Sequence, residues 1–278
     1  MRRHGIPGTR NSGDTTEFRG HDTRRNSGDT ILIRRQRDPP LSGSAMARLA
    51  RIVIPHVAHH ITQRGNRRLP IFFSDEDRSA YLDLLAAAFA SSATRCLAWC
   101  LMDNHVHLIL VPESAGGLRA ALGEAHRRYT RRVNFREGWR GYLFQGRFAS
   151  YPMDDPHLMA AVRYVENNPV AARMVARAEN WPWSSARSHI AGKRVTGDPL
   201  TDISALKAHV QNWTAMLRHG AELGEAGEQA ERMADAIEAR LRTGRPLAAA
   251  EWIAAQEAAL ARPLAPQKRG PKPKQSAN

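Results

Sequence analysis

Two histidines separated by one residue, His105 and His107, have the types and spacing that most directly suggest chemistry in this chain. They open the apolar segment 104–110, which we expect to form a β-strand. Alternate side chains of a strand share a face, so both imidazoles would project together while the intervening aliphatic side chains point into a core. Two imidazoles can bind one divalent cation but leave its coordination incomplete, so a third ligand must come from elsewhere. The alternative is a pair of ordinary, half-buried histidines.

A third ligand can come from a helix that we expect to begin at Asp155-Pro156 and to end before Pro169. Tyr164 and Asn168 lie four residues apart on this helix and therefore share a face. The Asn168 carbonyl oxygen could bind the metal. The Tyr164 hydroxyl, a poor nucleophile at a pKa of about 10, could attack a phosphodiester if a metal neutralised the developing charge. The alternative for Tyr164 is an edge tyrosine that only packs.

Tyr129 is the rival nucleophile. It lies on the apolar stripe of a helix predicted for residues 116–136, so we expect its side chain to be part of the core instead. The stripe consists of Leu118, Leu122, Ala125, Tyr129 and Val133.

Arginines and aromatic residues are interleaved along the segment that contains this helix. Eight arginines but only two acidic residues, Glu124 and Glu137, lie between Arg119 and Arg147. Guanidinium groups suit phosphates and ring faces suit unstacked bases, so we expect this surface to bind nucleic acid. The candidate contacts are Arg127, Arg128, Arg131, Arg132 and Arg147, interleaved with Tyr129, Phe135, Trp139, Tyr142, Phe144 and Phe148. An ordinary solvated helix face is the alternative.

The composition of the whole chain agrees with an anionic partner. The 278 residues include 41 Lys and Arg against 27 Asp and Glu, a formal net charge of +14. Nucleic acids and anionic membrane surfaces are the usual partners of such a chain. No apolar run approaches the roughly 20 residues that span a bilayer, and no signal peptide is visible. We expect Cys96 and Cys100 to be reduced core residues, which is typical of a cytoplasmic protein.

The elements expected around these residues form an α+β fold. Residues 1–45 are polar and contain a direct repeat, and we expect a disordered or non-native extension, with translation beginning at Met46. We expect strands at 56–64, 95–102 and 105–111, helices at 75–91 and 116–136, and an irregular strand or hairpin at 138–152. With the helix from Asp155, this order predicts an α+β sandwich, a central antiparallel sheet with helices on one side. Residues 191–278 are expected to be helical and to end in a basic tail at 268–274.

Four segments, taken in order, resemble those of REP-associated tyrosine transposases, which belong to the single-tyrosine HUH (His, hydrophobic, His) endonuclease superfamily. They are Thr62-Gln63-Arg64-Gly65-Asn66-Arg67, His105-Val106-His107, Leu143-Phe144-Gln145-Gly146-Arg147-Phe148, and Arg163-Tyr164-Val165-Glu166-Asn167-Asn168-Pro169-Val170 with Trp181-Pro182-Trp183-Ser184-Ser185 after it. The resemblance covers roughly residues 46–190, which we expect to form one domain. We also expect Arg64 and Arg67, in the first segment, to bind nucleic acid.

The resemblance implies a fold, a reaction and a substrate. The fold would be a ferredoxin-like HUH domain with Mg²⁺ or Mn²⁺ held by His105, His107 and Asn168. Tyr164 would attack the scissile phosphate of single-stranded DNA and leave a 5′-phosphotyrosine and a free 3′-OH. The substrate would be a palindromic hairpin repeat, and the protein a monomer or homodimer in the cytoplasm, associated with the nucleoid. The alternatives are a non-catalytic binder of structured nucleic acid and a hydrolase of small phosphate esters.

Overall fold

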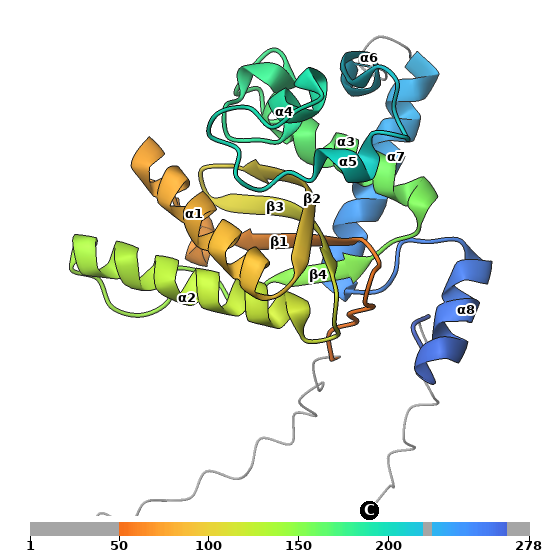
Figure 1. Ribbon diagram of the computed structural model, residues 1–278, viewed down its shortest axis with the longest axis horizontal. Coiled ribbons are helices and arrows are strands. Elements are labelled where there is room, and N and C mark those ends of the chain that lie inside the picture. Colours follow the sequence, from red (N-terminus) through yellow and green to blue (C-terminus); the bar gives the residue numbers. More distant parts are fainter. Residues whose placement is uncertain (1–49, 219–223, 266–278) are drawn as a thin grey trace, which may run out of the picture. The chain divides into compact units, whose positions relative to one another are not determined.

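The centre of the described chain, residues 50–218 and 224–265 of a computed structural model, is a four-stranded antiparallel sheet (Figure 1). Its strands are β1 (His59–Arg64), β2 (Thr94–Leu101), β3 (His105–Pro112) and β4 (Ala149–Pro152), in the order β2-β3-β1-β4. The helix α1 (Asp75–Ser91) connects β1 to β2, and α2 (Gly117–Glu137) connects β3 to β4. This βαββαβ connectivity is ferredoxin-like and confirms the expected α+β sandwich with a central antiparallel sheet.

Local sequence signals account for most of the element boundaries. The Ser74 hydroxyl accepts a hydrogen bond from the Asp77 amide and caps the start of α1. The first strand begins at His59 rather than at His56, because His56 lies in a turn with a positive φ of 61°. Of the irregular segment expected at 138–152, only β4 is a strand.

One face of the sheet is covered by α1 and α2, and an apolar core lies between them and the strands (Figure 1). The strands contribute Ile61, Trp99, Leu101, Val106, Leu108 and Leu110 to this core. The expected α2 stripe is confirmed, since Leu118, Leu122, Ala125, Tyr129 and Val133 are all buried in it.

The helix α3 (Asp155–Ala171) packs on the opposite face, so the expectation of helices on one side of the sheet was wrong (Figure 1). Ile109 and Val111 of β3 form a second core there with Val162 and Val165 of α3. The reason lies in the strands, because β2 and β3 are apolar at nearly every position and not only at alternate ones. Strands of this kind are buried on both faces.

The expectation that α3 ends before Pro169 was also wrong, because the helix continues to Ala171. A proline inside a helix lacks one N–H donor and crowds the carbonyl four residues earlier. Here both effects fall in the last turn, and the Ala172 amide still donates to the Asn168 carbonyl at 2.9 Å. Asn168 is therefore helical, as Tyr164 is, and the two side chains keep their one-turn spacing.

Helices follow α3 through the rest of the described chain, as expected. They are α4 (Ala186–Ala191), α5 (Ile203–Leu206), α6 (Trp213–Arg218), α7 (Gly224–Thr243) and α8 (Ala250–Leu260), and the short 3₁₀ helices are η1 (Asn66–Arg68) and η2 (Ala178–Asn180). Within the described residues, no helix is long and apolar enough to cross a membrane. The expectations for residues 1–45 and for the basic tail at 268–274 lie outside the described residues.

Candidate active site

The pairing of β1 with β3 brings a polar cluster to the face of the sheet that α3 covers. Arg64 pairs with His105 and Thr62 with His107 in the antiparallel register. Side chains of paired residues share a face, so both histidines point away from the α1–α2 core. The imidazole centroids of His105 and His107 are 4.9 Å apart, and the structure thus brings this pair together as expected.

Tyr164 and Asn168 of α3 lie against these histidines. The Tyr164 ring centroid is 5.5 Å from that of His107, in an edge-to-face arrangement. The Asn168 side chain lies beside both groups, since it influences the pKa of His105 and that of Tyr164. Two histidines from a strand, and a tyrosine and an amide from a helix, therefore form one cluster.

A third histidine, His60 of β1, belongs to the same cluster and was missed in the sequence. Its Nε2 lies 3.0 Å from His107 Nδ1, and its Nδ1 lies 3.1 Å from the Tyr151 hydroxyl. The His60 ring also contacts Tyr164, with centroids 5.9 Å apart. One signal was available, since His60 lies at an alternate position to Thr62 and Arg64 in a predicted strand and so shares their face.

These contacts determine which ring nitrogens remain available. The Asn104 side-chain oxygen lies 2.7 Å from His105 Nδ1 and accepts a hydrogen bond from the Nδ1–H, which leaves His105 Nε2 with a lone pair. His107 Nδ1–H can donate to His60 Nε2 while His60 Nδ1–H donates to Tyr151, which leaves His107 Nε2 with a lone pair too. If the hydrogen bonds ran the other way, from Tyr151 through His60 to His107, His107 Nε2 would carry a proton. A cation on His107 Nε2 therefore requires the arrangement in which His107 Nδ1–H donates to His60.

Burial keeps the histidines neutral. Desolvation, followed by the nearby Arg64 charge, lowers the pKa of His105 from 6.5 to about 4, although the Asn168 hydrogen bond opposes this shift. Desolvation also lowers the pKa of His107 well below its ordinary value and that of His60 to about 3. Neutral imidazoles carry the lone pair that a metal needs.

The pKa of the candidate nucleophile, Tyr164, is shifted upward, in contrast to those of the histidines. Burial and then the Glu238 carboxylate of α7 raise the pKa of Tyr164, and the Asn168 hydrogen bond and the Arg64 charge oppose them. The net direction is upward, so the hydroxyl stays protonated at neutral pH. An attacking Tyr164 oxygen would need additional positive charge beside it.

The donor set of this cluster, two borderline imidazoles and one hard oxygen, can take a divalent cation. It offers the two imidazole Nε2 atoms and the Asn168 amide oxygen, and the first two are oriented by partners on their Nδ1 atoms. In the part of the chain that the structure describes, no three His, Cys, Asp or Glu side chains are grouped to hold a metal. Asn168 is the amide beside His105 and is the candidate for a third ligand.

The arginines expected to bind nucleic acid lie in two places. Arg64 lies in the cluster, opposite His105, and Arg67 follows in η1. Arg127, Arg128, Arg131 and Arg132 are exposed on α2, in the layer on the other side of the sheet, and Arg147 is exposed just before β4. The structure thus brings Arg64 to the histidines and keeps the α2 arginines apart from them.

Tyr129, the rival nucleophile, is in the core as expected. Its side chain is fully buried, and its hydroxyl donates to the Ile71 carbonyl oxygen at 2.7 Å. Burial raises the pKa of this hydroxyl far above its ordinary value. Tyr129 lies in the α1–α2 core and not on the histidine face of the sheet.

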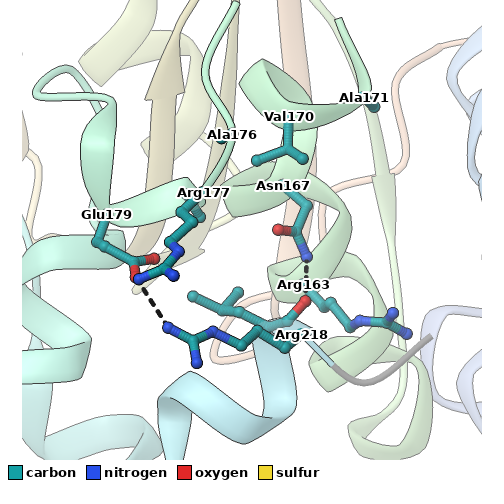
Figure 2. Close-up of a pocket in the computed structure, with 10 residues that line it drawn as sticks. Arg163, Asn167, Val170, Ala171, Ala176, Arg177, Glu179 and Arg218 are labelled. Atoms are coloured by element: carbon teal, nitrogen blue, oxygen red, sulfur yellow. Dashed lines mark hydrogen bonds and ion pairs between the residues drawn. The ribbon is translucent and has the colours of Figure 1, made fainter. Parts of the chain in front are cut away.

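A pocket of about 420 Å³ lies beside α3 and is lined by Arg163 and Asn167 (Figure 2). These residues precede Tyr164 and Asn168 by one position, about 100° around the helix. Figure 2 shows that the Arg163 guanidinium points away from the other two lining arginines, and one of these, Arg218, pairs with Glu179 at 3.3 Å. The lining groups thus do not converge on one ligand, and the candidate chemistry lies on the tyrosine side of α3.

Comparison with known proteins agrees with this constellation. Residues 54–168 match the model of a family described as IS200-like transposases. No curated protein matches the sequence. Among solved structures, the chain is similar to a REP-associated tyrosine transposase bound to a REP hairpin, with 19% identity, 57% of this chain and 93% of the other covered, and a TM-score of 0.47. It is also similar to a protein of Deinococcus radiodurans R1 described as a transposase, with 19% identity, 42% and 95% covered, and a TM-score of 0.32.

The family match spans all four strands of the sheet and the helix that holds Tyr164. Both structural similarities have TM-scores below 0.5, so the assignment rests on the family match. Residues 54–168 of this chain are similar to the IS200-like transposase family, in agreement with the motifs of the sequence.

Proposed function

We propose that this protein is a transposase that cuts and rejoins single-stranded DNA, with Tyr164 as the nucleophile. The observation that carries the proposal is the contact of Tyr164 with His107, 5.5 Å between ring centroids, together with the position of Asn168 beside Tyr164 and His105. Nucleophile and candidate ligands come from one chain and lie within one cluster. A DNA substrate places the proposed activity in the cytoplasm, with the nucleoid.

In the proposed cleavage, the Tyr164 oxygen attacks the scissile phosphorus and loses its proton as the new P–O bond forms. The bond between phosphorus and the 3′ oxygen breaks, and that oxygen takes up a proton. The products are a 5′-phosphotyrosine and a free 3′-OH. Rejoining reverses these steps, since a 3′-OH attacks the phosphotyrosine and Tyr164 takes back its proton.

His105, His107 and Asn168 would hold Mg²⁺ or Mn²⁺ in this reaction. The cation supplies the positive charge that polarises the phosphate and favours the ionised tyrosine. Asn168 also orients the Tyr164 hydroxyl through its hydrogen bond. Arg64, on the same face, adds a fixed positive charge beside the place where the phosphate would bind.

A hairpin-forming repeat is the proposed substrate, since four segments of this chain resemble those of REP-associated transposases. The exposed arginines of α2 favour a polyanion, and they make a small phosphate ester a poorer candidate. The second candidate function is a non-catalytic binder of structured nucleic acid, for which the exposed α2 arginines alone would suffice.

A covalent adduct tests the proposal. Hairpin single strands labelled on the 3′ side of the scissile phosphate are incubated with the protein and Mn²⁺, and protein-linked label is measured after denaturation in SDS. We expect an adduct with the native chain and with Tyr129→Phe, which loses one buried hydrogen bond, about 1 kcal/mol of stability. We expect none with Tyr164→Phe.

The two candidate functions give different results. An adduct that persists in Tyr164→Phe and disappears in Tyr129→Phe contradicts the choice of nucleophile. Hairpin binding without any adduct, in the native chain and in both variants, supports the non-catalytic binder.

A further inference from the structure

A groove of about 550 Å³ lies at the C-terminal end of α2, outside the cluster described above. Its lining includes Arg127, Arg131, Asn134, Phe135, Trp139 and Arg140. α2 ends at Gly138, which adopts the left-handed conformation with a φ of 65°, and the chain then turns back toward β4. The groove therefore combines the last turns of a helix with the loop that follows it.

The aromatic side chains of this groove are exposed to a degree that packing does not explain. The Phe135 ring is 90% exposed and the Trp139 ring 49% exposed. Trp139 is held in place, since its amide donates to the Asn134 carbonyl at 2.9 Å and its ring meets the Phe73 ring edge-on, 5.6 Å between centroids. Exposed aromatic rings on a fixed backbone are typical of surfaces that bind a partner.

The charge of the groove is positive and only partly neutralised. Arg127 is paired with Glu124, with nitrogen–oxygen distances of 2.7 and 2.9 Å. Arg131 and Arg140 have no acidic partner among the described residues, and no acidic residue lines the groove. Two guanidinium groups are thus free for an anion next to the exposed rings.

The groove lies at the same end of the sheet as His105. The loop after it is joined to the end of β1, since the Asn66 amide donates to the Leu143 carbonyl at 2.8 Å and the Gln145 amide donates to the Arg64 carbonyl at 3.0 Å. Arg64 is the residue that pairs with His105. A DNA strand at the histidine cluster therefore needs only to pass around this end of the sheet to reach the groove.

We propose that this groove binds an unpaired nucleobase of the DNA that the active site cleaves. The base stacks on Phe135 and Trp139, and Arg131 and Arg140 contact the phosphates on either side of it. Every base has a π-face, and guanidinium groups bind the backbone, so the chemistry fits a single strand. A second copy of this chain fits less well, because it carries a net charge of +14 and would bring like charges together. The inference rests on the proposed function and names a second contact for its substrate.

Binding without cleavage tests this inference. A fluorescent hairpin with a single-stranded extension is titrated with protein in EDTA at fixed salt, and dissociation constants are read from anisotropy. We expect Phe135→Ala to weaken binding by about 5- to 150-fold, the range measured for loss of one base stack, and Phe135→Trp to retain it. Leu260→Ala is the control, because Leu260 is a large apolar side chain, 38% exposed at the end of α8, that does not line the groove.

A second arm replaces single bases of the extension by abasic sites. We expect an abasic site at one position to weaken DNA binding by the native chain. The same abasic site should lower the affinity of Phe135→Ala much less, because this variant already lacks the ring on which the base would stack. Equal losses in both proteins, or native affinity in Phe135→Ala, overturn the inference. A native dimer that Phe135→Ala converts to a monomer in sedimentation also overturns it and assigns the groove to contacts between copies.

The result is separable from that of the proposed function. An adduct that depends on Tyr164, with unchanged binding in Phe135→Ala, removes the groove and leaves the chemistry in place. A groove that binds DNA, with an adduct that forms in Tyr164→Phe, removes the nucleophile assignment and leaves the groove.

Discussion

Among the five tyrosines of the chain, Tyr164 differs from the others in its surroundings. Tyr81, Tyr129 and Tyr151 are fully buried, and each hydroxyl is hydrogen-bonded inside the protein. Tyr142 is 88% exposed in the loop after α2. Tyr164 is half-buried in contact with a histidine face and is held by an amide. A nucleophile must be reachable and fixed at once, and among these five residues Tyr164 meets both requirements.

His60 provides a sharp test at the scale of the residue. It accepts the His107 Nδ1–H in the arrangement that leaves His107 Nε2 free. We expect His60→Phe to weaken Mn²⁺ binding by about 10- to 100-fold, because His107 loses the partner that fixes its tautomer and ring orientation. His60→Gln keeps an oxygen acceptor, so we expect it to retain most of the affinity. Titration calorimetry of the protein with Mn²⁺ measures both variants.

The metal-free protein gives an independent readout of the same role. Nitrogen-15 chemical shifts of His107 report which ring nitrogen carries the proton. We expect the Nδ1–H form to be less populated in His60→Phe than in His60→Gln. Equal tautomer populations and equal Mn²⁺ affinities in the two variants would show that His60 only fills space.

Some residues of the cluster could be paired from the sequence, and others could not. His105 and His107, and Tyr164 and Asn168, could be paired from the sequence because strand and helix periodicities bring residues two and four apart to one face. The contacts of His60 with His107 and with Tyr151 span 47 and 91 residues. They depend on the register of β1 with β3 and β4, which no local pattern provides.

At the scale of the element, a buried carboxylate fixes the helix that carries Tyr164. Glu166 of α3 is fully buried and lies on the side of the helix away from His105 and His107. Its carboxylate accepts hydrogen bonds from the Ser185 hydroxyl at 2.5 Å and the Trp213 indole N–H at 2.7 Å, and it pairs with His189 at 2.6 Å. The Ser185 amide in turn donates to the Trp99 carbonyl of β2. One carboxylate thus joins α3 to two later helices and, through Ser185, to the sheet.

Glu166→Ala should therefore loosen the helix as well as lower stability. Removing the carboxylate leaves the Trp213 indole and His189 without this partner, and it leaves the Ser185 hydroxyl only the Trp99 carbonyl at 3.3 Å, so we expect a loss of about 3–5 kcal/mol in the free energy of unfolding. Trp213→Phe removes one hydrogen bond and should cost about 1 kcal/mol for that bond. Urea unfolding followed by circular dichroism compares the two. Similar losses in both variants would mean that Glu166 does not act as the common partner.

Two features show the limits of local patterns at this scale. Pro169 predicts a helix end, but α3 continues to Ala171 because the lost hydrogen bond falls in its last turn. Cys96 and Cys100 are free and buried as expected, but they belong to opposite cores. A bulge between Cys96 and Ala98 shifts the alternation of β2 by one residue. Both features depend on tertiary packing, while the order of strands and helices followed from periodicity alone.

At the scale of the whole described fold, the sheet separates the candidate active site from the exposed arginines of α2. The candidate chemistry lies on the face that α3 covers, and the exposed arginines of α2 lie in the layer on the opposite face (Figure 1). The two layers meet at the end of the sheet where Arg64 and the Asp103-Asn104 turn lie. A DNA strand that contacts both must wrap around this end, so phosphates far from the scissile one contribute to affinity.

Salt dependence measures that wrapping. Each phosphate neutralised on a single strand steepens the plot of log affinity against log salt concentration by about 0.7. We therefore expect the double variant Arg128→Gln and Arg131→Gln to flatten this plot by about 1.4, since both side chains are exposed and neither forms an ion pair with an acidic residue in the described part of the chain. Arg95→Gln is a control with a charge change of the same sign. It lies at the far end of β2, paired with Asp202 at 3.5 Å, and should leave the slope unchanged. A double variant with the native slope would show that these two arginines do not contact phosphates, and a native chain whose affinity does not change with salt would show that no phosphate contact contributes to binding.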